Sequence, residues 1–206
     1  MTSFARLDVF CSASNNADPK KDDCLGAVDP KTGKVTPLVD SHGKQVRVPA
    51  GVDIDANARL AAVLGPQLRD VSGASDPIAN NLTGIAVSAS VFKSYVTYGG
   101  PWDYKTVTRD ERFAPFGNYH YGFVGSEWGW RGSVLLAEAG RAQQSRYEQT
   151  GQAGHKGDGG WPGIPYLPEI SGKAPYGDFV EDQTLIQMGV DSSNANLKHV
   201  RVPCKD

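Results

Sequence analysis

The sequence has no apolar run that approaches the roughly 20 residues a helix needs to cross a bilayer, so we expect no membrane span. Its first residues, MTSFARLDVFC, also lack the apolar core of a signal peptide, so any export would need another carrier. Lysine and arginine form no cluster, and the formal net charge is −2 over 206 residues. Because affinity for phosphate chains depends largely on clustered cations, this pattern argues against nucleic acid as the substrate.

Cysteine is scarce, since Cys11, Cys24 and Cys204 are the three in the chain. They form no CxxC pair and have no zinc-type spacing to histidine, so we expect no metal and no cofactor. Cys11 and Cys24 are close enough in sequence to close a small loop. Two states stay open: one disulfide with one free thiol in an oxidising compartment, or three buried thiols in the cytosol.

Length and composition predict a single domain with much loop structure. The chain is long enough to bury one core, but hydrophobic residues make up only 39% and there are 24 glycines and 13 prolines. We predict an α+β fold, a predominantly helical single domain with a small β-hairpin and long Gly/Pro-rich loops. Residues 1–49 are expected to form an N-terminal arm with the hairpin, and residues 50–206 the catalytic domain.

Hydrophobic periodicity and capping residues locate the elements of this fold. The pattern of residues 35–48 predicts a hairpin around a turn at 41–44, with Pro37 acceptable only in an edge strand. Helices are expected over 54–64 with Asp53 as N-cap and Pro66 ending or kinking it, over 85–96, over 133–147 with Ser133 as N-cap, and from an N-cap at Asp178 to a stop at Gly189. Residues 151–175 are expected to form a loop, and residues 198–202 a closing edge strand.

The stretch 99–130 is the most unusual part of the chain, because it contains nearly half of the aromatic residues and most of the plausible acid–base groups. Glycine lets a backbone approach a ligand closely, and Trp and Tyr offer apolar faces with a polar tip. We therefore expect a loop that lines a site, although Phe113, Phe116, Phe123 and Trp128 are equally explained as core packing. Polar residues among these aromatics need a partner or a function if they are buried.

Four motifs occur in a fixed order: WDYK at 102–105, FGNYHYG at 116–122, LLAEAGRAQ at 135–143 and YGDFVEDQ at 176–183, after VPAGVDIDANARLA at 48–61. In this order the chain resembles the polymorphic toxin type 44 family of bacterial effectors over about residues 50–190. The resemblance implies an antibacterial effector for competition between bacteria, carried by a specialised secretion system such as type VI. It also implies a cognate immunity protein that neutralises the toxin in the producer.

The motif residues supply the groups that cleavage of an amide or isopeptide bond in peptidoglycan requires, so we predict a wall hydrolase that acts in the periplasm of the target cell. His120 would act as the base, Asp103 or Asp182 would orient it or bind a metal, and Lys105 or Asn118 would stabilise the oxyanion. A Cys24 nucleophile paired with His120 is a further variant. The expected substrate-binding residues are Trp102, Tyr104, Tyr119, Tyr121 and Gln183.

Two other classes of function are compatible with the same residues. A metal-independent RNase acting in the target cytoplasm would use His120 as base and Lys105 on the phosphate, with Tyr119 or Trp102 stacking on a base. The missing basic surface argues against it. A non-catalytic sugar-binding module would explain the tryptophans but leaves the polar residues without a role.

Overall fold

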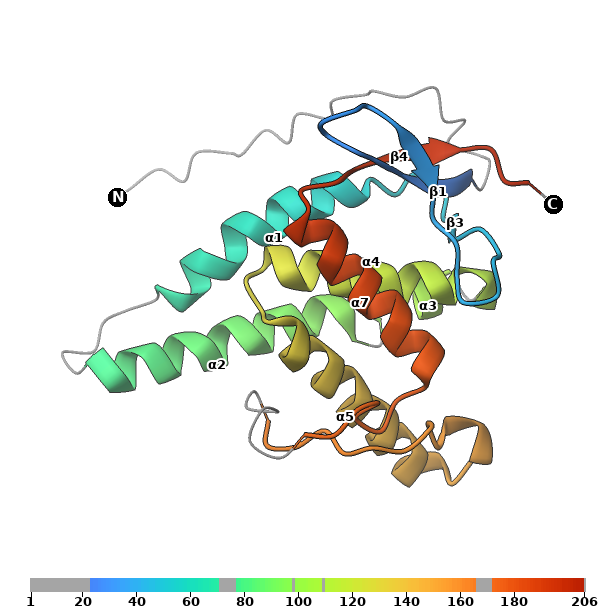
Figure 1. Cartoon of the computed structure of the whole chain (residues 1–206). Helices are drawn as coiled ribbons and strands as arrows, with labels where there is room; N and C mark the ends of the chain where they lie inside the picture. Colours follow the sequence, from blue (N-terminus) through green and yellow to red (C-terminus); the bar gives the residue numbers. More distant parts are fainter. Residues whose placement is uncertain (1–22, 71–76, 98, 109, 166–171, 206) are drawn as a thin grey trace.

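The computed structural model describes residues 23–70, 77–97, 99–108, 110–165 and 172–205. They form a predominantly helical domain with one small antiparallel sheet, which confirms the predicted α+β fold and the single domain. The sheet lies at one end of the molecule and helix α5 (Gly132–Thr150) at the other (Figure 1). None of the helices in these segments combines the length and apolarity that crossing a bilayer requires.

The sheet is built around β1 (Asp23–Val28), which pairs antiparallel with every other strand, namely β2 (Val35–Pro37), β3 (Arg47–Val48) and β4 (Lys198–Val202). β4 pairs with residues 24–28 of β1 along one edge of that strand. The other edge of β1 is shared by β2 and β3. The predicted hairpin is therefore correct only at its tip, where Val39 and Gln45 form a bridge. The two strands of the predicted hairpin, β2 and β3, pair with β1 and together form one interrupted strand beside it. Residues 39–45, between them, project from the line of this strand and return to it. Pro37 lies in an edge strand, as predicted.

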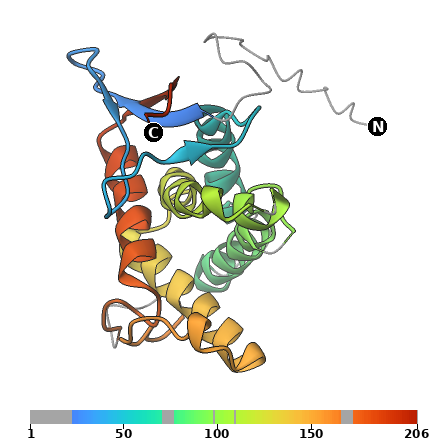
Figure 2. The ribbon, with the colours of Figure 1, turned by 90° about the vertical axis from the view of Figure 1, so that its right-hand side faces the viewer.

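The remaining helices surround one central helix, α4 (Ala114–Glu127). Figure 2 shows α4 nearly end-on in the middle of the domain, with α7 (Val180–Asn194) and α5 beside it. α1 (Ile54–Arg69) packs against both α4 and α2 (Pro77–Val96), and the short elements α3 (Tyr104–Val107) and η1 (Glu111–Phe113) lead into α4. The core of the domain contains Leu25, Phe92, Phe116, Tyr119, Val124, Trp128, Leu135 and Ile186.

Two glycines allow α4 and α7 to cross with their backbones in contact. A Cβ atom on Gly122 would overlap the carbonyl group of Ile186, and a Cβ atom on Gly189 would overlap the carbonyl oxygen of Tyr119. The prediction that Gly189 ends the last helix is therefore wrong, because α7 continues to Asn194. This crossing brings the middle of α4 close to the first turns of α7, where the candidate site lies.

The expected loop at 99–130 is mostly helical instead. α3, η1 and α4 occupy residues 104–107 and 111–127. The sequence showed no helical period here because α4 is buried on several faces, so apolar residues recur all round it and not on one stripe. The aromatic side chains that were expected to line a site largely fill the core.

Several predicted helix ends are also corrected by tertiary contacts. Asp53 is the N-cap of α1 and accepts from the Ala56 N–H at 2.8 Å, as predicted, but the helix continues through Pro66 to Arg69 because it packs along α2 and α4. Ser133 lies inside α5, whose N-cap is Arg131. The helix predicted over 85–96 is present but begins earlier, at Pro77, and the edge strand at 198–202 is confirmed. Residues 151–165 form turns with the short helix η2 (Ala153–His155).

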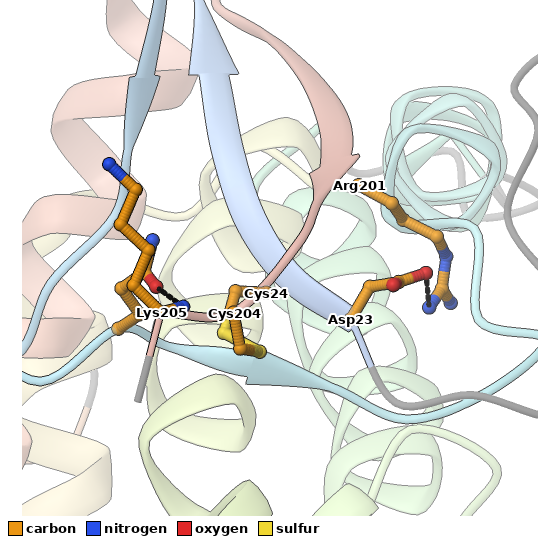
Figure 3. Close-up of a disulfide and its surroundings, with 6 residues drawn as sticks. Asp23, Cys24, Arg201, Cys204 and Lys205 are labelled. Carbon is orange, nitrogen blue, oxygen red and sulfur yellow. Dashed lines mark hydrogen bonds and ion pairs between the residues drawn. A yellow bond between two sulfur atoms is a disulfide. The ribbon is translucent and has the colours of Figure 1, made fainter.

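A disulfide joins Cys24 in β1 to Cys204, which follows β4, across a sequence separation of 180 residues (Figure 3). The suggested loop between Cys11 and Cys24 is therefore wrong, and Cys11 lies outside the described residues. Proximity in sequence favoured the nearer partner, but antiparallel pairing of β1 with β4 places Cys24 opposite Val202. The disulfide therefore joins β1 covalently to the segment that follows β4.

Candidate active site

A cleft of about 470 Å³ opens beside the first turn of α7. Its walls come from α3, η1, α5, the segment after α5, and α7. The lining residues are Lys105, Glu111, Gln143, Arg146, Gly154, Asp158, Phe179, Glu181 and Asp182. We name it the Asp182 cleft, and its volume is in the range of ordinary small-ligand sites.

The segment before α7 determines where Asp182 lies. Phe179 is the N-cap residue of α7 but has no capping side chain, and the cap is supplied from elsewhere: Asp158 Oδ2 accepts from the Val180 N–H at 2.8 Å. The Asp158 N–H in turn donates to the Asp178 carbonyl oxygen at 2.8 Å. The loop after α5 is thereby held against α7, and Asp182 in the first turn faces the cleft.

The environment of Asp182 raises its pKa above the ordinary value of an aspartate. Burial is the largest cause, and the nearby charges of Glu181 and Asp158 act in the same direction. The Lys105 ammonium and the Asn118 amide favour the charged form and oppose the shift. A carboxyl group whose pKa is raised is a stronger base than an ordinary carboxylate, and it can accept a proton in one step and return it in another.

A second carboxyl group, Asp178, does not line the cleft and is 4% exposed, but it is close enough to Asp182 and Lys105 to feel their charges. Burial, together with the charge of Asp182, raises the pKa of Asp178 to about 6. The hydrogen bond from Gln183 Nε2 (2.9 Å), the bond from the Phe179 N–H (2.9 Å) and the Lys105 charge favour its ionised form. The charge of Asp182 therefore disfavours ionisation of Asp178, while the Lys105 charge favours the ionised form of both groups.

The structure brings together three of the five predicted catalytic residues. Lys105 and Asp182 line the same cleft, and Asn118 lies next to Asp182. The Nδ2 atom of Asn118 is buried and has no well-formed hydrogen bond of its own. Gln183, predicted to bind substrate, instead donates to Asp178 and to the Leu136 carbonyl oxygen (3.0 Å), so it orients the second carboxylate.

The other two predicted catalytic residues lie elsewhere. His120 is fully buried, where Trp102, Tyr104 and Phe116 surround its ring and the Asn57 amide donates to Nε2 at 3.0 Å. Burial, with a smaller contribution from His199, lowers the pKa of His120 to about 3. Asp103 accepts from the Gly99 N–H at 3.1 Å in the turn before α3. Neither residue lines the cleft.

The four aromatic residues predicted to bind substrate are packed in the protein. Trp102, Tyr104 and Tyr119 are each less than a tenth exposed, and Tyr121 is partly buried. The hydroxyl groups of the three tyrosines have internal partners: that of Tyr104 accepts from Asn57, that of Tyr119 lies 2.7 Å from His199 Nε2, and that of Tyr121 donates to the Leu135 carbonyl oxygen. None of the four lines the Asp182 cleft.

Sequence reasoning missed several residues that the fold places at the cleft. Asp178 was interpreted as a helix cap, and Glu111, Arg146 and Asp158 were given no role. The late motif did contain the signal, because YGDFVEDQ has two aspartates four residues apart around a helix start. Nothing in the sequence indicated that Arg146, near the end of α5, would face them.

A separate polar network was also unforeseen. His199 in β4 lies with Nδ1 2.6 Å from Asp55 Oδ1 and with Nε2 2.7 Å from the Tyr119 hydroxyl, and its side chain is 2% exposed. It ties the sheet to α1 and α4 and does not reach the cleft. Among the described residues, no group of three or more His, Cys, Asp or Glu side chains is arranged to hold a metal ion.

The fold and the site together define a small helical α+β domain with a charged cleft at the start of its last helix. The family model for bacterial toxin 44 matches residues 76–195, which is more than half of the chain, so the protein belongs to this family of bacterial toxins. No curated protein and no solved structure matches it. Every residue of the Asp182 cleft lies inside the matched region, whereas the sheet strand β1, strand β4 and the disulfide lie outside it.

Proposed function

We propose that this bacterial toxin is a peptidoglycan hydrolase that cleaves an amide or isopeptide bond in the wall of rival bacteria. The observation that supports this is that the Asp182 carboxyl group, with its raised pKa, and Lys105 line the same open cleft, with the buried Asp178 carboxyl group close enough to feel the charges of both. Amide hydrolysis needs a base for water, a proton donor for the leaving amine and a positive group for the oxyanion. These groups meet at the Asp182 cleft.

In the proposed reaction the Asp182 carboxylate takes a proton from a water molecule as the water oxygen bonds to the carbonyl carbon. The π electrons of the carbonyl move to its oxygen, where the Lys105 ammonium stabilises the negative charge, while the buried Asn118 amide acts on the Asp182 carboxylate itself. When the C–N bond breaks, its electron pair goes to nitrogen, which takes the proton from Asp182. A carboxylic acid and an amine are released, and Asp182 is again ionised.

His120 has a different role in this proposal from the one predicted from the sequence. Its ring is enclosed and its pKa of about 3 keeps it uncharged at neutral pH. We propose that it is a positioning residue: with Asn57 and Tyr104 it fixes α4 against α1 and α3, and hence fixes Asn118 and Lys105. That His120 acts as the base stays a prediction.

The Cys24–Cys204 disulfide supports the periplasm of the target cell as the place of action, because disulfides persist in oxidising compartments. Delivery by a specialised secretion system and neutralisation by a cognate immunity protein complete the proposal. The immunity protein is expected to cover the mouth of the Asp182 cleft.

Digestion of purified wall material tests the proposal. The wild-type toxin is expected to release soluble wall peptides with new amino and carboxyl ends, detected by mass spectrometry. Asp182→Asn should release at least about 100-fold less, as for loss of a general base. Asp191→Asn on the exposed side of the same helix is the matched control and should match the wild type. Intact walls together with degraded cellular RNA would replace this proposal by the RNase.

A further inference from the structure

Two opposite charges that line the Asp182 cleft have no partner within the part of the chain that the structure describes. They are the Glu111 carboxylate, from η1, and the Arg146 guanidinium, from the last turns of α5. The other acids of the cleft are engaged: Asp158 caps α7, Glu181 accepts from His42 at 2.8 Å, and Asp182 faces Lys105. The cleft therefore keeps one positive and one negative group available, on separate elements.

We propose that the cleft is specific for a wall peptide that carries both charges near the scissile bond, with Arg146 holding a free carboxylate and Glu111 holding a free ammonium group. This rests on the proposed function and names its substrate class. A guanidinium binds a carboxylate through two parallel N–H groups, and a carboxylate is the usual partner of an ammonium group. A stem peptide that is not cross-linked presents both charges beside an amide bond: its diamino acid keeps a free side-chain ammonium group, and its last residue keeps a free carboxylate.

The charge of the cleft also selects against the competing substrates. Four carboxylates and two cations line it, so a chain of phosphates would meet an excess of like charge. A neutral glycan would leave both Glu111 and Arg146 without a partner after water is displaced, which costs binding free energy. A zwitterionic peptide end satisfies both groups at once.

Binding of defined probes tests the proposal separately from catalysis. The probe is the synthetic dipeptide Nα-acetyl-lysyl-D-alanine, with a free side-chain amine and a free C-terminal carboxylate. Two matched probes are its C-terminal amide and its form acetylated on the side-chain amine, and a ten-residue RNA is the fourth. Affinities are measured by calorimetry in the full chain with Asp182→Asn, so that the probe is not cleaved.

We expect Arg146→Gln to weaken binding of the free-acid probe about tenfold or more and to leave the amide probe unchanged, because a hydrogen bond to a charged group is lost. Glu111→Gln should weaken binding of the free-amine probe in the same way and leave the probe acetylated on the side-chain amine unchanged. Glu148→Gln, exposed on α5 and outside the cleft, is the control. Equal affinity for all three peptides, or tighter binding of the RNA, would overturn the proposal.

The two proposals can fail separately. If wall material is not hydrolysed but the probes show this charge dependence, the specificity stands and the reaction is wrong. If walls are hydrolysed and neither substitution changes the preference among the probes, the reaction stands and the assignment of Arg146 and Glu111 is wrong.

Discussion

Gln183 holds Asp178 in place through one amide nitrogen, which donates to Asp178 Oδ2 at 2.9 Å and to the Leu136 carbonyl oxygen at 3.0 Å. Through these two hydrogen bonds Gln183 connects the buried Asp178 carboxylate, in the segment before α7, to α5. Because the donated hydrogen bond favours the ionised form, Gln183 lowers the pKa of Asp178 against the effect of burial.

Gln183→Met should therefore raise the pKa of Asp178. Loss of the donor removes an influence that lowers this pKa, so it should rise above about 6. In an NMR titration the carboxyl carbon signal of Asp178 is expected to change at higher pH than in the wild type, while Gln187→Met, one turn later on α7, leaves the titration in place. An unchanged titration of Asp178 would show that Gln183 acts on structure alone.

His120→Phe should make the protein less sensitive to acid. The folded-state pKa of His120, about 3, lies below the ordinary value of 6.5, so protonation favours the unfolded chain. The stabilisation is complete above pH 6.5 and is lost as the pH falls toward 3. Between pH 7.5 and 5 the loss amounts to about 2 kcal/mol of unfolding free energy.

Chemical denaturation at both pH values measures this difference. Phenylalanine removes the titrating group and keeps a ring among Trp102, Tyr104 and Phe116, so the variant should lose about 2 kcal/mol less than the wild type. His42→Phe, at an exposed site, is the control. Equal losses in wild type and His120→Phe would mean that His120 is protonated in the folded protein.

Removal of the disulfide by Cys24→Ser with Cys204→Ser should lower the free energy of unfolding by about 2–5 kcal/mol, because the unfolded chain is no longer constrained. The melting temperature of the wild type should fall in reductant, and that of the double variant should not. A melting temperature that reductant leaves unchanged in both proteins would contradict a stabilising role.

Gly189→Ala should destabilise the α4–α7 crossing, because its Cβ atom would overlap the Tyr119 carbonyl oxygen. Overpacking of a filled interior costs about 1–3 kcal/mol, and the separation of the two helices would also lower activity by moving Asn118 from Asp182. Gly154→Ala is the matched control, since a Cβ atom there meets no neighbour within 4 Å. Equal melting temperatures for the two variants would refute the close crossing.

Local signals in the sequence predicted the elements that depend on neighbours along the chain. The 54–64 period, the Asp53 cap and the 198–202 alternation all appear in the structure, because a helix cap and a strand period need only residues a few positions apart. The same reasoning failed for α4. A helix buried on several sides has no polar face, so its period is hidden in the sequence.

The sequence by itself determined the chemical content of this protein, namely the family motifs, the acidic pair in YGDFVEDQ and the single-domain helical class. Only the tertiary structure decided which groups meet. The backbone contact at Gly122 and Gly189 sets α7 beside α4, the Asp158 cap holds the loop that precedes it, and burial then raises the pKa values of Asp178 and Asp182. Burial and distance are properties of the packed chain, so His120 is in the core and Asp182 at the cleft although both lie in equally prominent motifs.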